Sequence, residues 1–236
     1  MRDQVTGRGQ NAPELIVFDL DGTLIDSIGD IASSANQSLA EAYADEARLP
    51  LGIIRSFVGS GARHLIERCV AAAGQSHDDV QRVFDRFIEI YRSRLTQTTR
   101  LYPGMDEALT DLGASVRLAV LTNKPGGMSR MIINDLGLSD RFLTVIGGDD
   151  LKTKKPDPEG LLKIAADAGV PIDRVAMVGD SAIDIQTARN AGAASVAVLW
   201  GYDVEGARSA EPDAVVETPH QLAVAILAVR AVARRA

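Results

Sequence analysis

Short apolar runs recur along the chain and alternate, from residue 101 onward, with segments of helical periodicity. The runs predict strands at residues 15–18, 117–121, 144–146, 174–178, 195–199 and 214–216. Helices are expected over residues 125–136, 158–169, 181–192 and 220–236, the first three closed by a glycine. This order of strands and helices predicts an α/β fold with one parallel sheet and helices on both of its faces.

Residues 27–100 interrupt this order and show only helical periodicity. In the clearest helix, apolar residues are spaced by three and four, and Ser76 is its expected N-cap. These apolar residues are Val80, Val83, Phe84, Phe87, Tyr91 and Leu95. Weaker helical patterns cover residues 28–43, 51–58 and 62–73. An insertion of this length exceeds an ordinary strand-to-helix loop, so it predicts a small all-helical cap inserted after the first strand. The alternative is that these helices simply cover the sheet.

The pattern divides the chain into three parts. Residues 1–13 are polar and predict a flexible N-terminal tail. Residues 14–26 and 101–236 are expected to form the α/β core, and residues 27–100 the helical cap.

The first predicted strand ends in Asp19-Leu20-Asp21-Gly22-Thr23. Because side chains alternate along a strand, the carboxylates of Asp19 and Asp21 project to the same side. Unpaired, they would repel each other, so a cation between them is favoured. Gly22 permits a sharp turn that exposes amide N–H groups to an anion. The segment therefore predicts a site for a hard metal and a phosphate, although an ordinary Asp-Gly turn is the alternative for these residues taken alone.

Three further polar segments stand at junctions between strands and helices. They are Leu121-Thr122-Asn123-Lys124-Pro125, Lys154-Lys155-Pro156-Asp157-Pro158 and Val178-Gly179-Asp180-Ser181-Ala182-Ile183-Asp184. In open parallel sheets, ligands bind at the carboxyl ends of the strands. We therefore expect these segments to meet Asp19 and Asp21 at one edge of the sheet.

These four segments, in this order and spacing, resemble the haloacid dehalogenase-like hydrolase superfamily, and in particular its phosphatases with a helical cap. The resemblance covers the chain from Glu14 onward. The segments at 19–27, at 58–62 (Val-Gly-Ser-Gly-Ala) and at 121–125 are most similar to the phosphoglycolate phosphatase branch. The resemblance implies a Rossmann-like core with a small helical cap, Mg²⁺ as the cofactor and a small phosphorylated metabolite as the substrate.

By this resemblance, Asp19 is the nucleophile that forms an aspartyl-phosphate, and Asp21 is the general acid and base. Thr122 and Asn123 would contact the transferring phosphoryl group, and Lys155 would compensate its charge. Lys154 is a rival for that role, but the family places its lysine directly before the proline. Gly22 and Thr23 are also expected to contact the substrate.

The resemblance likewise implies the metal ligands. Asp19 and Asp180 would offer carboxylates, and Asp21 its main-chain carbonyl. Asp184, one helical turn after Asp180, would bind the metal directly or order its water. How close Lys124 lies to the site is left open by the sequence.

The cap is expected to select the substrate. Gly59, Ser60 and Gly61 would form a flexible tip that faces the core site. Arg63 follows this tip and could bind a substrate carboxylate. The alternative is that Gly59 ends one helix while Arg63 points to solvent.

Composition narrows the class of protein. The formal net charge of −7 argues against binding to nucleic acid or to an anionic membrane. No segment is long and apolar enough to span a bilayer, and no signal peptide is visible. The single cysteine, Cys69, fits a reducing cytosol. We therefore expect a cytoplasmic protein, as a monomer or homodimer. The resemblance implies a role in carbohydrate metabolism, with 2-phosphoglycolate as the first candidate substrate.

Related reactions are separated by single residues. Asp21 argues against a dehalogenase, which needs no acid and base there. A phosphonate hydrolase of this superfamily uses a cap lysine, and residues 27–100 contain none. A sugar-phosphate mutase is less favoured, because Asp26-Ser27-Ile28 lacks the histidine that such mutases carry. A sugar-phosphate or pyrophosphate hydrolase on the same core, and a non-catalytic phosphate-binding module, stay open as alternatives.

Overall fold

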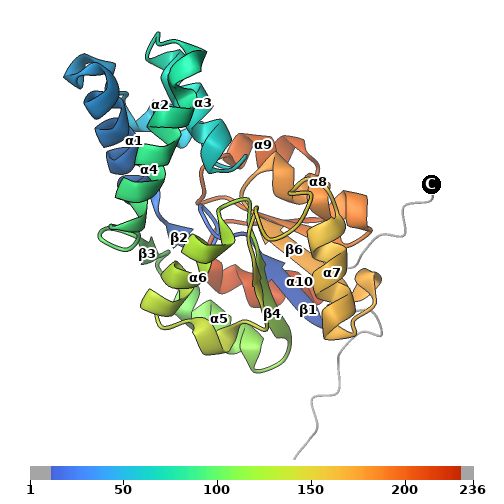
Figure 1. The fold of residues 1–236 in the computed structure, drawn as a ribbon. Helices are drawn as coiled ribbons and strands as arrows, with labels where there is room; N and C mark the ends of the chain where they lie inside the picture. Colours follow the sequence, from blue (N-terminus) through green and yellow to red (C-terminus); the bar gives the residue numbers. More distant parts are fainter. Residues whose placement is uncertain (1–11, 230–236) are drawn as a thin grey trace, which may run out of the picture.

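The computed structural model describes residues 12–229, and a six-stranded parallel sheet forms its centre (Figure 1). The strand order is β5-β4-β1-β6-β7-β8. The strands are β1 (Leu15–Phe18), β4 (Arg117–Leu121), β5 (Val145–Ile146), β6 (Val175–Gly179), β7 (Ala194–Val198) and β8 (Ala214–Val216). The predicted parallel sheet is confirmed, and each predicted strand agrees with the structure to within about one residue.

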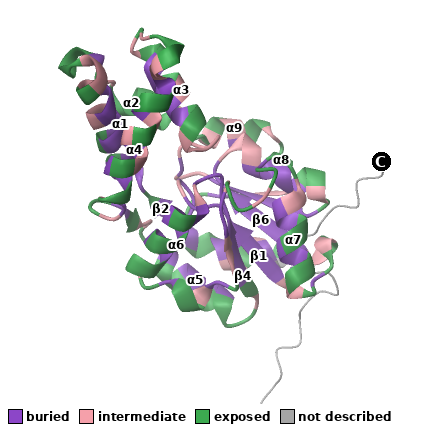
Figure 2. Ribbon diagram, in the orientation of Figure 1, coloured by how far each residue is buried: buried purple, intermediate pink, exposed green. Residues whose placement is uncertain are grey.

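Strand β1 lies inside the sheet, between β4 and β6, which explains its continuous apolar sequence. Ile16 and Phe18 belong to one hydrophobic core, and Leu15 and Val17 to another on the opposite face. This alternation is the two-residue period of a strand that is buried on both faces. Figure 2 shows the strands buried and the outer surfaces of the helices exposed.

Helices cover both faces of the sheet, as predicted. Side chains of α5 (Met105–Gly113), α6 (Gly126–Asp135) and α10 (Leu222–Ala228) join the core that contains Phe18. Side chains of α7 (Glu159–Ala168) and α8 (Ala182–Ala191) join the core that contains Val17. Helix α9 (Val204–Ser209) is only six residues long, too short to show a helical period, and was not expected.

The insertion after β1 is helical and stands beside the core (Figure 1). Its helices are α1 (Ile28–Tyr43), α2 (Leu51–Arg55), α3 (Ala62–Ala72) and α4 (Val80–Arg92). Helix α2 ends three residues before the expected position. Ser76 caps a short 3-10 turn, His77–Asp79, that leads into α4, rather than α4 itself.

Two short strands join the insertion to the core. β2 (Ile25–Asp26) and β3 (Arg100–Leu101) pair in antiparallel fashion, with Ile25 opposite Leu101. Beside them, the buried carboxylate of Asp30 accepts hydrogen bonds from the backbone N–H groups and hydroxyls of Thr98 and Thr99. The segments through which the chain enters and leaves the insertion are therefore hydrogen-bonded to each other. The division into a core and a cap at residues 27 and 100 stays a prediction.

The two chain ends fall largely outside the described part. Most of the predicted tail (1–13) and the end of the predicted last helix (230–236) lie outside residues 12–229. Within that range, no helix combines the length and the apolar character that a membrane span requires.

Candidate active site

The loop after β1 places two carboxylates at the centre of the sheet edge. Asp19 follows the last residue of β1 and is buried, and its backbone N–H donates to the carbonyl of Val178 on β6. The loop then turns through Gly22, whose φ of +84° lies in the left-handed region. A Cβ at Gly22 would lie 2.3 Å from an oxygen of Asp180, so this position requires glycine.

Three buried carboxylates gather at this edge. One oxygen each from Asp19, Asp180 and Asp184 lie within 4.8 Å of one another. They meet because β1 and β6 are neighbours in register, with Phe18 opposite Val178, so both strands end at the same level. Asp184 adds its carboxylate from the first turn of α8.

Lys155 is the lysine that reaches this cluster. Its Nζ lies 2.8 Å from Oδ1 of Asp19 and 2.6 Å from Oδ1 of Asp184, and its side chain is 2% exposed. Burial disfavours the charged amine, but the attraction of Asp184 and Asp19 outweighs it and raises the pKa of Lys155 to about 12. The neighbouring Lys154 is exposed and donates to the carbonyl of Ser60 at 2.8 Å.

The carboxylates of this cluster repel one another in a buried setting. Desolvation, followed by the charges of Asp184 and Asp19, raises the pKa of Asp180 to about 8. Desolvation also raises the pKa of Asp19 to about 6, although Lys155 opposes the shift. When all three carboxylates are ionised, one ammonium leaves two negative charges, which a divalent cation would balance.

Protein donors fix the orientation of two of these carboxylates. Asp180 accepts from the hydroxyl of Thr23 at 3.0 Å and from the backbone N–H of Tyr202 at 2.6 Å. Asp184 forms a capping box with Ser181, whose hydroxyl donates to it at 2.6 Å. The hydroxyl of Thr23 thus orients Asp180, and the expected contact of Thr23 with the substrate stays a prediction.

Thr122 and Asn123 follow β4 and line the same site. Both are buried. The side-chain amide of Asn123 donates to the carbonyls of Gly59 in the insertion (2.9 Å) and of Lys155 (3.0 Å). Asn123 therefore links Gly59, in the predicted tip, to the core.

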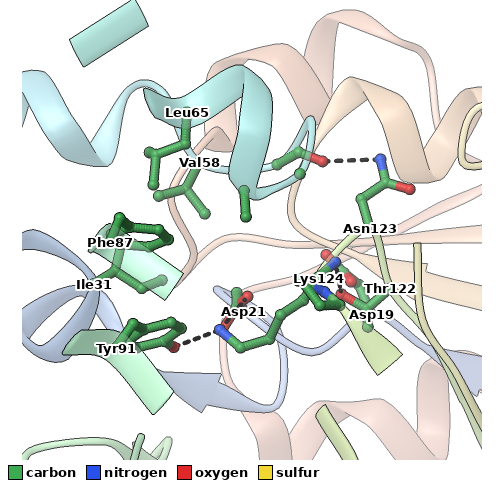
Figure 3. A pocket seen from close by; sticks show the side chains of 14 residues that line it. Asp19, Asp21, Ile31, Val58, Leu65, Phe87, Tyr91, Thr122, Asn123 and Lys124 are labelled. Atoms are coloured by element: carbon green, nitrogen blue, oxygen red, sulfur yellow. Dashed lines mark hydrogen bonds and ion pairs between the residues drawn. The ribbon is translucent and has the colours of Figure 1, made fainter. Parts of the chain in front are cut away.

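The sequence did not decide how close Lys124 lies to the site, and the structure places it there. Its side chain is 4% exposed, and its Nζ lies 3.0 Å from each carboxylate oxygen of Asp21 (Figure 3). It also donates to the hydroxyl of Tyr91 on α4 at 2.5 Å. The hydroxyl of Ser27 also donates to Asp21, at 2.5 Å. The sequence signal that could have placed Lys124 in the site was its position directly after Thr122 and Asn123.

A small cavity of about 40 Å³ separates this edge of the sheet from the insertion. Its core side carries Asp19, Asp21, Thr122, Asn123, Lys124 and Pro125. Its insertion side carries Tyr91, Gly59, Gly61 and the apolar residues Ile31, Val58, Ala62, Leu65 and Phe87 (Figure 3).

Arg63 does not line this cavity. Its side chain is exposed, donates to Gln81 at 2.7 Å and lies 3.3 Å from Glu67. Of the expected cap residues, the structure thus brings Gly61 to the cavity, whereas Arg63 lines a separate, open groove together with Lys154, Lys155 and Ile183.

A family model described as haloacid dehalogenase-like hydrolase matches residues 16–198. The chain belongs to this family. The match begins within β1 and ends with β7, so it includes every carboxylate of the cluster.

The chain is also similar to curated proteins that carry an assigned name. The chain is 41% identical to phosphoglycolate phosphatase from Mesorhizobium japonicum over 208 residues, which are 86% of this chain and 89% of that protein. It is 38% identical to phosphoglycolate phosphatase from Rhodospirillum rubrum, over 82% of each chain. A crystal structure of a predicted phosphoglycolate phosphatase from Haemophilus somnus superimposes with a TM-score of 0.85, at 29% identity, over 92% of this chain and 99% of that one.

Proposed function

We propose that the protein is a Mg²⁺-dependent phosphomonoesterase that works through an aspartyl-phosphate on Asp19. The observation that carries the proposal is the buried cluster of Asp19, Asp180 and Asp184 with Lys155 bound to Asp19. The relatives named phosphoglycolate phosphatase support 2-phosphoglycolate as the substrate.

Asp19 is the nucleophile in this proposal. One of its carboxylate oxygens bonds to phosphorus while the bond from phosphorus to the ester oxygen breaks. A carboxylate is a weak nucleophile, so catalysis depends on offsetting the charge of the phosphoryl oxygens. Lys155 supplies one positive charge, and the hydroxyl of Thr122 supplies a hydrogen bond. The N–H of Gly22 does not take part, because it donates to the carbonyl of Ile25 within the turn.

Asp21 moves the protons. It gives a proton to the departing ester oxygen and then takes one from the water that attacks phosphorus. This attack breaks the bond between Asp19 and phosphorus and releases phosphate. Asp21 lines the cavity beside Asp19, and Lys124 and Ser27 hold its carboxylate.

The donor set of the acidic cluster fits Mg²⁺. Asp19 and Asp180 offer carboxylate oxygens, which this ion prefers, and Asp184 is held by Lys155 and Ser181 beside them. Such an ion would neutralise the carboxylates, whose repulsion contributes to the raised pKa of Asp180. When bound, Mg²⁺ would draw charge from the phosphoryl oxygens.

A phosphatase panel with Mg²⁺ and with EDTA tests this function. Phosphate release should require Mg²⁺ and should disappear in Asp19→Asn, because an amide cannot attack phosphorus. Acid-quenched wild-type protein should carry an alkali-labile phosphoryl group on the peptide that contains Asp19. Asp167→Asn, at an exposed position on α7, is the matched control and should keep full activity. Turnover by Asp19→Asn, or no phosphate release from any ester by the wild type, would refute the proposal.

A further inference from the structure

Lys124 is the one positively charged side chain among the described residues that line the cavity. Its ammonium is almost fully buried, at 4% exposure, and its three N–H groups are divided between the two oxygens of Asp21 and the hydroxyl of Tyr91. A second lysine is thus buried at this site, although Lys155 already supplies the charge beside Asp19. Its position needs an explanation of its own.

We propose that Lys124 and Tyr91 bind the carboxylate of the substrate and so select short phosphate esters that carry an acid group. The inference rests on the proposed phosphatase function and names the group on the substrate that the site recognises. A carboxylate would take over one N–H of Lys124 from Asp21. It would also accept the hydroxyl hydrogen of Tyr91, which has no acceptor within residues 12–229.

The distances limit the length of the substrate. Asp21, as the proton donor, touches the ester oxygen, and Lys124 lies 3.0 Å from Asp21. The Nζ of Lys124 therefore lies within two hydrogen-bond lengths of the ester oxygen, and a group bound to Nζ lies within three. A carboxylate separated from the ester oxygen by one methylene group lies inside this upper limit.

The rest of the cavity disfavours sugar phosphates. Beyond Lys124 and Tyr91, the insertion side is formed by the apolar side chains of Ile31, Val58, Leu65 and Phe87 (Figure 3). Sugar hydroxyls placed against these side chains would lose their water partners and gain none.

Tyr91 makes the proposed carboxylate site depend on the position of the insertion. It comes from α4 in the insertion, while Lys124 comes from the core, so the complete carboxylate site exists only when the two parts are together. The ring of Tyr91 is stacked on Phe87, with the centroids 5.4 Å apart, which fixes the direction of its hydroxyl.

The test compares two esters of similar size that differ in the acid group, 2-phosphoglycolate and ethyl phosphate. Wild-type protein should prefer 2-phosphoglycolate. In Lys124→Met, kcat/KM for 2-phosphoglycolate should fall roughly ten- to a hundredfold more than kcat/KM for ethyl phosphate, the scale of a lost charge-assisted hydrogen bond. Tyr91→Phe should show the same selective loss, several-fold, with KM carrying most of it. Lys152→Met, an exposed lysine, is the matched control.

Lys124→Met removes a buried charge beside Asp21 and can unfold the protein. Tyr91→Phe keeps the ring and its packing, so it decides the question if Lys124→Met does not fold. Equal losses on both esters by folded variants, or no loss on either, would overturn the inference.

Two further outcomes also count against the inference. One is a wild type that hydrolyses both esters with equal efficiency, which leaves the phosphatase function standing. The other is a selective loss in Arg63→Ala but not in Tyr91→Phe, which would return the carboxylate to Arg63. Failure of the phosphatase function itself appears differently, as a wild type that hydrolyses neither ester.

Discussion

Raising the pH should destabilise the metal-free protein, because two buried carboxyls then ionise without a cation. Folding raises the pKa of Asp19 from 3.8 to about 6 and that of Asp180 from 3.8 to about 8, mainly by desolvation. Between pH 3.8 and pH about 8, the folded protein therefore binds more protons than the unfolded chain. The free energy of unfolding must therefore fall as the pH rises.

The size of the effect follows from the shifts. Each pKa unit corresponds to about 1.4 kcal/mol, so the shift of Asp19 alone corresponds to about 3 kcal/mol. The shift of Asp180 is larger, although the two carboxyls titrate as a coupled set with Asp184 and their contributions do not simply add. We expect a loss of at least about 3 kcal/mol between pH about 5 and pH about 9, against a typical total stability of about 5–15 kcal/mol.

Urea denaturation in EDTA at several pH values measures this loss. Asp180→Asn should flatten the profile, because it removes one of the repelling carboxylates while keeping nearly the same volume. Asp167→Asn, on the surface of α7, should leave the profile unchanged.

Mg²⁺ supplies the second arm of the experiment. At a concentration of about 100 times Kd it should raise the free energy of unfolding by about 2.7 kcal/mol. The gain should be greater at high pH, because the cation competes with protons for the same oxygens. A metal-free stability that stays level or rises over this pH range, or an equal effect of Mg²⁺ at both ends of it, would refute the reasoning.

Two further substitutions test how the site and the insertion are held. Gly22→Ala should reduce both Mg²⁺ affinity and kcat more than tenfold, since its Cβ would lie 2.3 Å from Asp180. Gly74→Ala is the control for backbone strain in both assays, because Gly74 has a φ of +70° but open space around it. Asp30→Ala should lower the free energy of unfolding by about 2–5 kcal/mol, because it removes the acceptor of the N–H groups of Thr98 and of the buried Thr99. Urea denaturation checks this loss, and Ser33→Ala on the same helix should change stability little; equal stability of both variants would contradict the role of Asp30.

The sheet and most of the acidic site could be predicted from the sequence because their signals are local. A buried parallel strand needs a short apolar run, and Asp19, Thr122 and Asp180 each come within two residues of the end of such a run. The carboxyl ends of neighbouring parallel strands meet at one edge. The order of the motifs therefore brings these residues together without any knowledge of side-chain packing.

The cavity depends on how the insertion packs against the core, and the sequence did not predict this packing. Tyr91 belongs to the apolar stripe of α4, so the sequence predicts for it only a place in a helix core. Its hydroxyl became part of the site because it contacts Lys124, which follows β4 in the chain. Arg63 shows the reverse case, since this residue, two positions after the tip, is exposed outside the cavity and contacts Gln81 and Glu67.

The physical reason is the range of the interactions. Local patterns determine where strands end, and the common direction of parallel strands brings those ends to one edge of the sheet. The contacts of Lys124 with Asp21 and Tyr91 join residues that are 103 and 33 positions apart in the chain. Whether such a lysine points to solvent or to a buried carboxylate is settled by the packing of separate elements. The sequence thus determined the fold and its acidic edge, and only the tertiary structure decided which residues face that edge from the insertion.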